Sequence, residues 1–285
     1  MDTKSGSTRV SPTALTSAAA SDRGFLNNVS SMCFQPDGRR LAVGGMMGEV
    51  ALLDTDSLEI LSAFEAHKNV TWTMVFSPDS RLLATGSQDN TIRITDVTTN
   101  PPAAVATLRG HTAWVQGLCF SPDGLRLASC GKDRTLRLWD TRTWSPRGVF
   151  ESDGVAPSFL PDGQTLINGD AKQVRFWDIR SSDAWVLRGH HSYVYPVLLS
   201  PDGATIYSGG WDGFAGQPGC LRFWDAATGD PIAATGAADK IVTAAALSAD
   251  GSRLAISTLA TINILDTATG TTVVSFPEIA SGSLI

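Results

Sequence analysis

The chain has 285 residues, of which 18% are charged and 42% hydrophobic, and its formal net charge is −6. This length is enough for one large or two ordinary domains with a well-buried core. The mild acidity gives no general attraction for nucleic acid phosphates or anionic lipid, so we expect no nucleic acid or membrane partner. No run approaches the roughly 18 apolar residues that a membrane-spanning helix needs.

The first twenty residues are rich in Ser, Thr and Ala and have no apolar core of the kind found in a secretory signal. The four cysteines (Cys33, Cys119, Cys130 and Cys220) show neither C-x-x-C spacing nor the density of a disulfide framework. These features predict free thiols in a reducing compartment. We therefore expect a cytoplasmic protein, with a nuclear location as the alternative.

Two markers repeat in step along the chain. A Pro-Asp-Gly turn, or a near variant, occurs six times, with its aspartate at Asp37, Asp79, Asp123, Asp162, Asp202 and Asp250. A second aspartate ends a β-rich run after each turn, at Asp54, Asp96, Asp140, Asp178, Asp225 and Asp266. Two independent markers that keep step six times indicate an internal repeat of about 40 residues.

Each repeat reads as four short strands. In the third repeat, "WVQGLCF" (114–120) is followed by the turn "SPDG" and by two alternating runs, "LRLASC" and "TLRLWD". A more variable fourth run follows in each unit, and helical periodicity appears nowhere over a useful length. Four short antiparallel strands cannot bury both faces alone, so the repeats must stack around an axis, as in an all-β propeller.

Residues 110–140, "GHTAWVQGLCFSPDGLRLASCGKDRTLRLWD", resemble an almost complete WD40 repeat. The resemblance extends over residues 25–277, where the second and fifth repeats are also clear and the first, fourth and sixth lack the Gly-His dipeptide. It implies a WD40-type β-propeller of four-stranded antiparallel blades. We expect residues 1–24 to be a flexible N-terminal segment or to add one outer strand, and residues 278–285 to be a C-terminal tail.

Six repeats are visible, and six blades are the favoured reading. Two alternatives remain open for the ring. A strand near residues 13–19 could close it in competition with residues 271–276, or a seven-bladed ring could lack one blade.

A histidine, a hydroxyl residue and an aspartate recur in three repeats, and the same residue types carry out nucleophilic catalysis elsewhere. Active sites are seldom repeated in several blades of one propeller. The WD40 resemblance instead implies a structural hydrogen-bond network, completed by tryptophan in two repeats. Its members are His67, Thr85, Asp89, His111, Ser129, Asp133, Trp139, His190, Ser208, Asp212 and Trp224. We expect no catalytic residue, metal or cofactor, because no hydrolase, phosphate-binding or metal-binding motif is present.

The resemblance also implies a protein-binding face, called the top, built from loops before the first strand and between the second and third strands. The expected contact residues are Val70, Trp72, Gln88, Trp114, Gln116, Lys132, Tyr193, Tyr195 and Trp211. Five of these nine are aromatic, the residue class that dominates binding hot spots. Alternatively, some of these rings fill the channel mouth or cover neighbouring blades.

Repeat 5 carries six extra residues, Gly213–Pro218, immediately after Trp211 and Asp212. We expect this insertion to lengthen a loop on the top face and to add Phe214 to the contact residues. The alternative is a tolerated surface insertion, since lengthening a loop costs little free energy.

The sequence thus predicts a non-catalytic scaffold that binds a peptide or a partner domain on the aromatic top face, with membership of a multiprotein complex as one form of that role. A reader of modified or basic tails, of the histone or ubiquitin type, is the first alternative. An enzyme that uses the central cavity is the second alternative. It is the least favoured, because function is carried by sites rather than by folds and the sequence offers no catalytic candidate beyond the structural network. No small-molecule substrate is expected.

Overall fold

The computed structural model describes residues 28–170, 173–181, 184–190, 194–210, 221–235, 242–248, 250–258 and 261–277. Within these ranges every regular element is a β-strand, and the strands form six four-stranded sheets. The all-β prediction is therefore confirmed. The described part of the chain contains no helix long and apolar enough to cross a membrane.

Each sheet is one blade, made of four strands that follow one another in the chain and pair antiparallel with their neighbours. Blades 1 to 6 comprise, in order, β1 (Val29–Phe34), β2 (Arg40–Gly45), β3 (Glu49–Asp54), β4 (Ile60–Glu65); β5 (Thr71–Phe76), β6 (Leu82–Ser87), β7 (Ile92–Asp96), β8 (Ala103–Leu108); β9 (Val115–Phe120), β10 (Arg126–Gly131), β11 (Thr135–Asp140), β12 (Pro146–Glu151); β13 (Val155–Phe159), β14 (Thr165–Asp170), β15 (Gln173–Asp178), β16 (Ala184–Arg188); β17 (Val194–Leu199), β18 (Thr205–Gly210), β19 (Leu221–Asp225), β20 (Pro231–Thr235); β21 (Val242–Leu247), β22 (Arg253–Thr258), β23 (Thr261–Asp266) and β24 (Thr272–Pro277).

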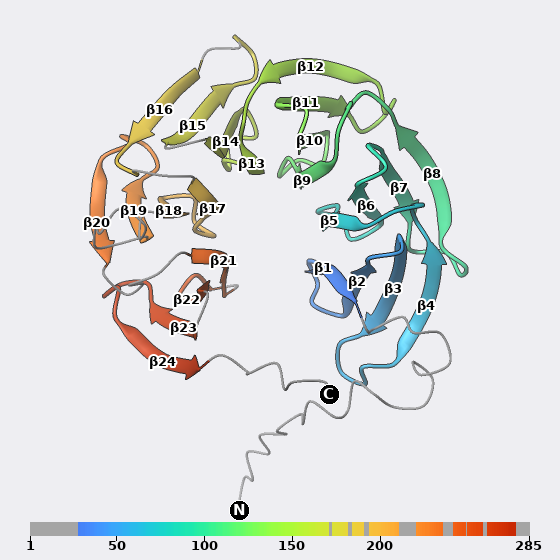
Figure 1. Cartoon of the computed structure of the whole chain (residues 1–285), viewed down its shortest axis with the longest axis horizontal. Helices are drawn as coiled ribbons and strands as arrows, with labels where there is room; N and C mark the ends of the chain where they lie inside the picture. Colours follow the sequence, from blue (N-terminus) through green and yellow to red (C-terminus); the bar gives the residue numbers. More distant parts are fainter. Residues whose placement is uncertain are drawn as a thin grey trace, which may run out of the picture.

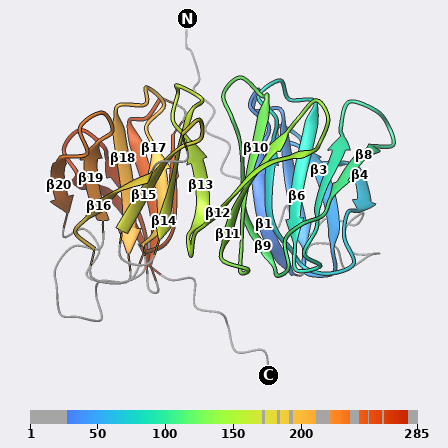
Figure 2. The ribbon, with the colours of Figure 1, turned by 90° about the horizontal axis from the view of Figure 1, so that it is seen from above.

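The blades stand around a central axis as a six-bladed β-propeller (Figure 1). The first strand of each blade lies innermost and the fourth lies at the periphery, and seen edge-on the strands run across the thickness of the disc (Figure 2). The prediction of six blades is confirmed. The outer strand of blade 6 is β24, while residues 13–19, the competing candidate, lie outside the described residues.

The hydrophobic core lies between neighbouring blades. Because successive side chains of a strand point to opposite faces, each small sheet has two apolar faces to cover. Val50 and Leu52 of blade 1, for example, pack with Met74 and Phe76 of blade 2, and all four are buried. Each blade therefore depends on its neighbours for burial, which explains why the sequence repeats its apolar pattern.

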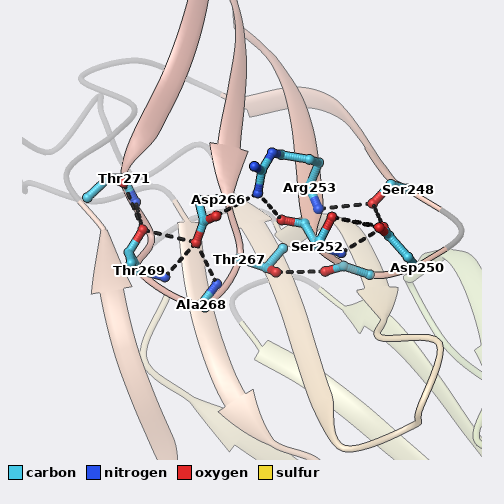
Figure 3. A network of polar contacts seen from close by, with 10 residues as sticks. Ser248, Asp250, Ser252, Arg253, Asp266, Thr267, Ala268, Thr269 and Thr271 are labelled. Atoms are coloured by element: carbon cyan, nitrogen blue, oxygen red, sulfur yellow. Dashed lines mark hydrogen bonds and ion pairs between the residues drawn. The ribbon is translucent and has the colours of Figure 1, made fainter.

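The recurring Ser/Asp-Gly turn between the first two strands is held by its own side chains, as blade 6 shows (Figure 3). Ser248 Oγ donates a hydrogen bond to Asp250 Oδ1 at 2.6 Å and accepts one from the Arg253 backbone N–H at 2.9 Å. The hydrogen bond from the Ser248 side chain, followed by those from the Ser252 backbone and side chain, lowers the pKa of Asp250 to about 2. The aspartate of this marker is thus a turn-forming residue.

The aspartate that ends the third strand has a matching role in the next turn (Figure 3). Asp266 Oδ1 accepts hydrogen bonds from the backbone N–H groups of Ala268 and Thr269, each at 3.1 Å. The Thr267 hydroxyl then donates to the Gly251 carbonyl at 2.6 Å and joins the two turns. Both sequence markers therefore stabilise the same end of the blade, opposite to the top.

Candidate interaction surface and its supporting network

A chain of hydrogen bonds runs through the interior of blade 3. Trp139 Nε1 donates to Ser129 Oγ at 2.9 Å, and Ser129 Oγ lies 2.8 Å from His111 Nε2. His111 Nδ1 lies 2.9 Å from Asp133 Oδ2. The Thr112 backbone N–H also donates to Asp133 Oδ2 at 2.9 Å. The chain therefore links a strand tryptophan to the loop aspartate at the top of the blade.

The protonation states follow from the partners. Burial lowers the pKa of His111, and Asp133 offsets part of that shift. Burial raises the pKa of Asp133, but hydrogen bonds from Thr112, Thr135 and His111 outweigh it and hold the pKa below 3.8. A neutral His111 that donates from Nδ1 to Asp133 and accepts at Nε2 from Ser129 satisfies every group in the chain.

Blade 2 contains the same arrangement without the indole. His67 Nε2 lies 2.8 Å from Thr85 Oγ1, and His67 Nδ1 lies 3.1 Å from Asp89 Oδ2. Thr95 stands where blade 3 has Trp139, and it is buried. The hydrogen-bond network of blade 2 therefore ends at Thr85.

Blade 5 repeats the inner part of the chain. Ser208 Oγ accepts from Trp224 Nε1 at 2.7 Å and lies 2.7 Å from His190 Nε2. Asp212, the expected loop member, lies outside the described residues.

Blade 4 has a substitute network that sequence reasoning missed. Trp177 Nε1 donates to Asn168 Oδ1 at 3.1 Å, and Asn168 Nδ2 donates to Ser152 Oγ at 2.7 Å. Ser152 takes the place of the Gly-His histidine and Asn168 takes the place of Ser129. The signal that could have found it is Trp177 itself, since a buried indole N–H needs an acceptor.

Two further threonines join the network and were not expected: Thr91, directly before β7, and Thr135, the first residue of β11. Thr91 Oγ1 donates to Asp89 Oδ1 at 2.6 Å, and Thr135 Oγ1 donates to Asp133 Oδ1 at 2.8 Å. Each threonine follows its aspartate by two residues, which is the spacing of a side-chain turn. They fix the carboxylates that hold the loops between the second and third strands.

The network has the residue types of a catalytic triad without its accessibility. Ser129 and Ser208 are completely buried, and each hydroxyl is shared between a histidine and an indole. A nucleophile must reach its substrate, and these hydroxyls meet only protein groups. The arrangement supports a structural role, since an unpaired buried polar group would cost about 1–3 kcal/mol.

The network positions two loops at the top of blades 2 and 3. The Gln88 backbone N–H donates to the Val70 carbonyl at 3.0 Å, and the Lys132 N–H donates to the Trp114 carbonyl at 2.8 Å. In each blade the loop between the second and third strands is thus fastened to the residues that precede the first strand. The expected contact residues of these blades therefore lie at the same end of the propeller.

The structure brings three of those residues together into what we call the top-face cluster: Trp72, Trp114 and Lys132. The rings of Trp72 and Trp114 stack with centroids 5.8 Å apart and an interplanar angle of 18°. Lys132 Nζ lies 4.0 Å from the Trp114 ring centroid. Trp72 is 37% exposed, Lys132 is exposed, and Gln88 and Gln116 beside them are half-buried.

One expected contact residue does not fit this surface. Val70, which directly precedes β5, is buried. Its carbonyl serves the loop instead, by accepting the Gln88 N–H. We therefore leave the Val70 side chain out of the proposed surface.

The expected contacts of repeat 5 cannot be placed in the same way. Tyr193, Trp211 and Phe214 lie outside the described residues, together with the whole insertion Gly213–Pro218, and the side chain of Tyr195 is also not described. In the part of the chain that is described, no group of three or more His, Cys, Asp or Glu side chains has an arrangement that could hold a metal ion.

Comparison with known families agrees with the architecture. Residues 58–96, 103–140 and 182–225 match the family described as "WD domain, G-beta repeat". Residues 16–75 match the family described as "Anaphase-promoting complex subunit 4 WD40 domain". Among curated proteins, no sequence matches the chain. Together the two matches cover more than half of the chain, and the structure has six four-stranded blades, so the chain belongs to the WD40-repeat β-propeller family.

Proposed function

We propose that this protein is a non-catalytic interaction scaffold that binds a peptide or a partner domain on its top face through Trp72, Trp114 and Lys132. The observation that carries the proposal is the stack of the exposed Trp72 ring on the half-buried Trp114 ring, with the ammonium group of Lys132 beside it. Exposed aromatic groups of this kind desolvate a large area with little loss of conformational entropy.

The hydrogen-bond network supports this proposal because it orders the top-face loops before a partner binds. Lys132 and Trp114 are joined through backbone atoms, and the neighbouring Asp133 is held by Thr112, Thr135 and His111. A surface that is already ordered pays less entropy on binding. WD40 domains typically bind other proteins, and one matched family is described by a subunit of a complex, which fits a role within an assembly.

The alternative of a reader for basic tails receives less support from this cluster. Lys132 already places a cation 4.0 Å from the Trp114 ring centroid. A second cation at that ring would meet the ammonium group of Lys132, and like charges at short range repel. A neutral or acidic partner surface fits the cluster better.

The proposal is tested by affinity capture with wild-type protein and a Trp72→Ala/Trp114→Ala double variant, followed by quantitative mass spectrometry. We expect the double variant to lose partners that the wild type retains, at an unchanged melting temperature. A Trp72→Phe/Trp114→Phe variant should retain most of them, because it keeps aromatic area.

The matched control is Leu125→Ala, which removes an exposed apolar side chain from the turn after β9, at the opposite end of the blade. If the double alanine variant captured the same partners in the same amounts as the wild type, the proposal would be wrong. A large fall in melting temperature of the double variant would instead assign the two indoles to the stability of the fold.

A further inference from the structure

In the described part of the chain, the sheets of blade 6 and blade 1 stand farther apart than the other neighbouring blades do (Figure 1). Elsewhere the innermost strands of successive blades pack together: β1 with β5, β5 with β9, β9 with β13, β13 with β17 and β17 with β21. Among the described residues, β21 has no comparable contact with β1. We call the two blade faces on either side of this wider spacing the seam.

The blade 1 side of the seam exposes side chains that are buried in the next blade. Met32 and Phe34 of β1 are 64% and 67% exposed. By strand register, their equivalents in β5 are Met74 and Phe76, which are 7% and 4% exposed. The residue types are the same, so the difference in exposure comes from the neighbouring blade. Blade 1 covers Met74 and Phe76, whereas no described blade packs on β1 in the same way.

The blade 6 side shows the reciprocal pattern. Ile262, the second residue of β23, is 47% exposed, and Val274 and Phe276 of the paired strand β24 are exposed as well. The equivalents of Ile262 in the other five blades are all buried, with at most 1% exposed: Val50, Ile92, Leu136, Val174 and Leu221.

The two sides match one another as the two sides of an internal interface do. Between blades 1 and 2, Val50 and Leu52 form one cluster with Met74 and Phe76. Blade 6 presents Ile262 and Ile264 at the positions of Val50 and Leu52. Blade 1 presents Met32 and Phe34 at the positions of Met74 and Phe76. Each chain therefore carries exposed parts of both halves of one blade-to-blade interface, while Val43, Ala51 and Leu53 on the same face of blade 1 are buried.

We propose that a second copy of this chain covers the seam, with blade 6 of each copy packed against blade 1 of the other. A two-fold axis lets two copies make this contact twice and leaves neither half free. Of the seam side chains (Met32, Phe34, Ile262, Ile264, Val274 and Phe276) none is ionisable.

The first test is the mass of the purified full chain in solution, measured by sedimentation over a range of concentrations. We expect a species of twice the 30.1 kDa chain mass that dissociates on dilution. Phe34→Asp should shift the equilibrium towards monomer by at least tenfold, and Ile262→Asp should do the same from the other side. Val149→Asp is the control, since Val149 is 53% exposed on the outer strand β12, away from the seam.

The second test separates a second copy from closure of the ring on itself. Phe34→Cys and Ile262→Cys variants are prepared separately, mixed and treated with a short bismaleimide, and the joined peptides are identified by mass spectrometry. We expect the two new cysteines to be linked between chains. A chain that carries both substitutions and is linked only within itself would overturn the proposal, as would a wild type that stays monomeric throughout or assembles beyond two copies.

Discussion

The hydroxyl of Ser129 accepts the indole N–H of Trp139 at 2.9 Å while it lies 2.8 Å from the imidazole of His111. One small side chain thus satisfies two larger buried groups, from the loop before β9 and from β11. Because a buried polar group without a partner is costly, this hydroxyl should matter more for stability than its size suggests.

Ser129→Ala should lower the free energy of unfolding by about 1–3 kcal/mol, because it leaves both His111 Nε2 and Trp139 Nε1 without their shared partner. Chemical denaturation measures the change. Ser145→Ala is the control, since Ser145 is exposed in the same blade and should change stability by less than about 0.5 kcal/mol. Equal effects of the two substitutions would show that the buried chain adds nothing to stability.

The stability of the protein should fall as the pH falls below neutrality. Burial lowers the pKa of His111 in the folded protein below its value of 6.5 in the unfolded chain. At a pH between the folded and the unfolded pKa, the unfolded chain therefore binds a proton that the folded chain does not. The contribution of His111 to stability is fully present above the pKa of the unfolded state. It is lost as the pH decreases from that pKa towards the lower pKa of the folded state. Asp133, whose pKa is held below 3.8, adds a further loss at lower pH.

The measurement is the melting temperature of wild type and His111→Ala between about pH 7 and pH 5. The wild type should lose more stability across this window than the variant, which starts lower at pH 7. Parallel pH profiles would exclude His111 as a source of the dependence.

Gly48→Ala should destabilise the protein by more than about 3 kcal/mol. Gly48 has φ +91°, and a Cβ there would overlap the backbone carbonyl of His67, which cannot move independently of the loop. Gly38 is the matched control, since it has φ +73° with open space around a Cβ. Gly38→Ala should cost only about 1–2 kcal/mol, the conformational penalty alone, and similar losses at both sites would refute the steric argument.

The thiols of Cys33 and Cys119 should react slowly in the folded protein. Burial raises the pKa of Cys33 to about 12 and raises the pKa of Cys119 as well, and the thiolate is the reactive form. Labelling with iodoacetamide at about pH 8, followed by peptide mapping, should modify both sites much faster in denaturant than in buffer. Rapid labelling of Cys119 in buffer would show that β9 opens readily.

Much of the architecture could be predicted because it is periodic. The six turns marked by Asp-Gly or, once, Asp-Ser and the six aspartates that end third strands determine where each blade turns, and blade 6 shows both markers bonded within their own turns. The residues of the network could be listed for the same reason. The substitute chain of Ser152, Asn168 and Trp177 could not, because its residue types differ and only the folded blade shows that they meet.

The candidate surface was predicted in part. The alignment of repeats placed Trp72 and Trp114 at one end of the propeller, but their stacking joins two different blades and depends on the angle between them. Val70 belongs to the same alignment and is buried, because the exposure of a loop residue depends on the direction of its side chain.

Met32 and Met74 show most clearly what each level decided. The sequence by itself determined that both are apolar residues in the first strand of a blade, since the turn and the alternating pattern are local. Only the tertiary structure decided that Met74 is buried and Met32 is exposed. The physical reason is that burial of a blade face requires a second blade packed against it. Whether the first blade has such a neighbour depends on how the first and last blades of the ring are placed.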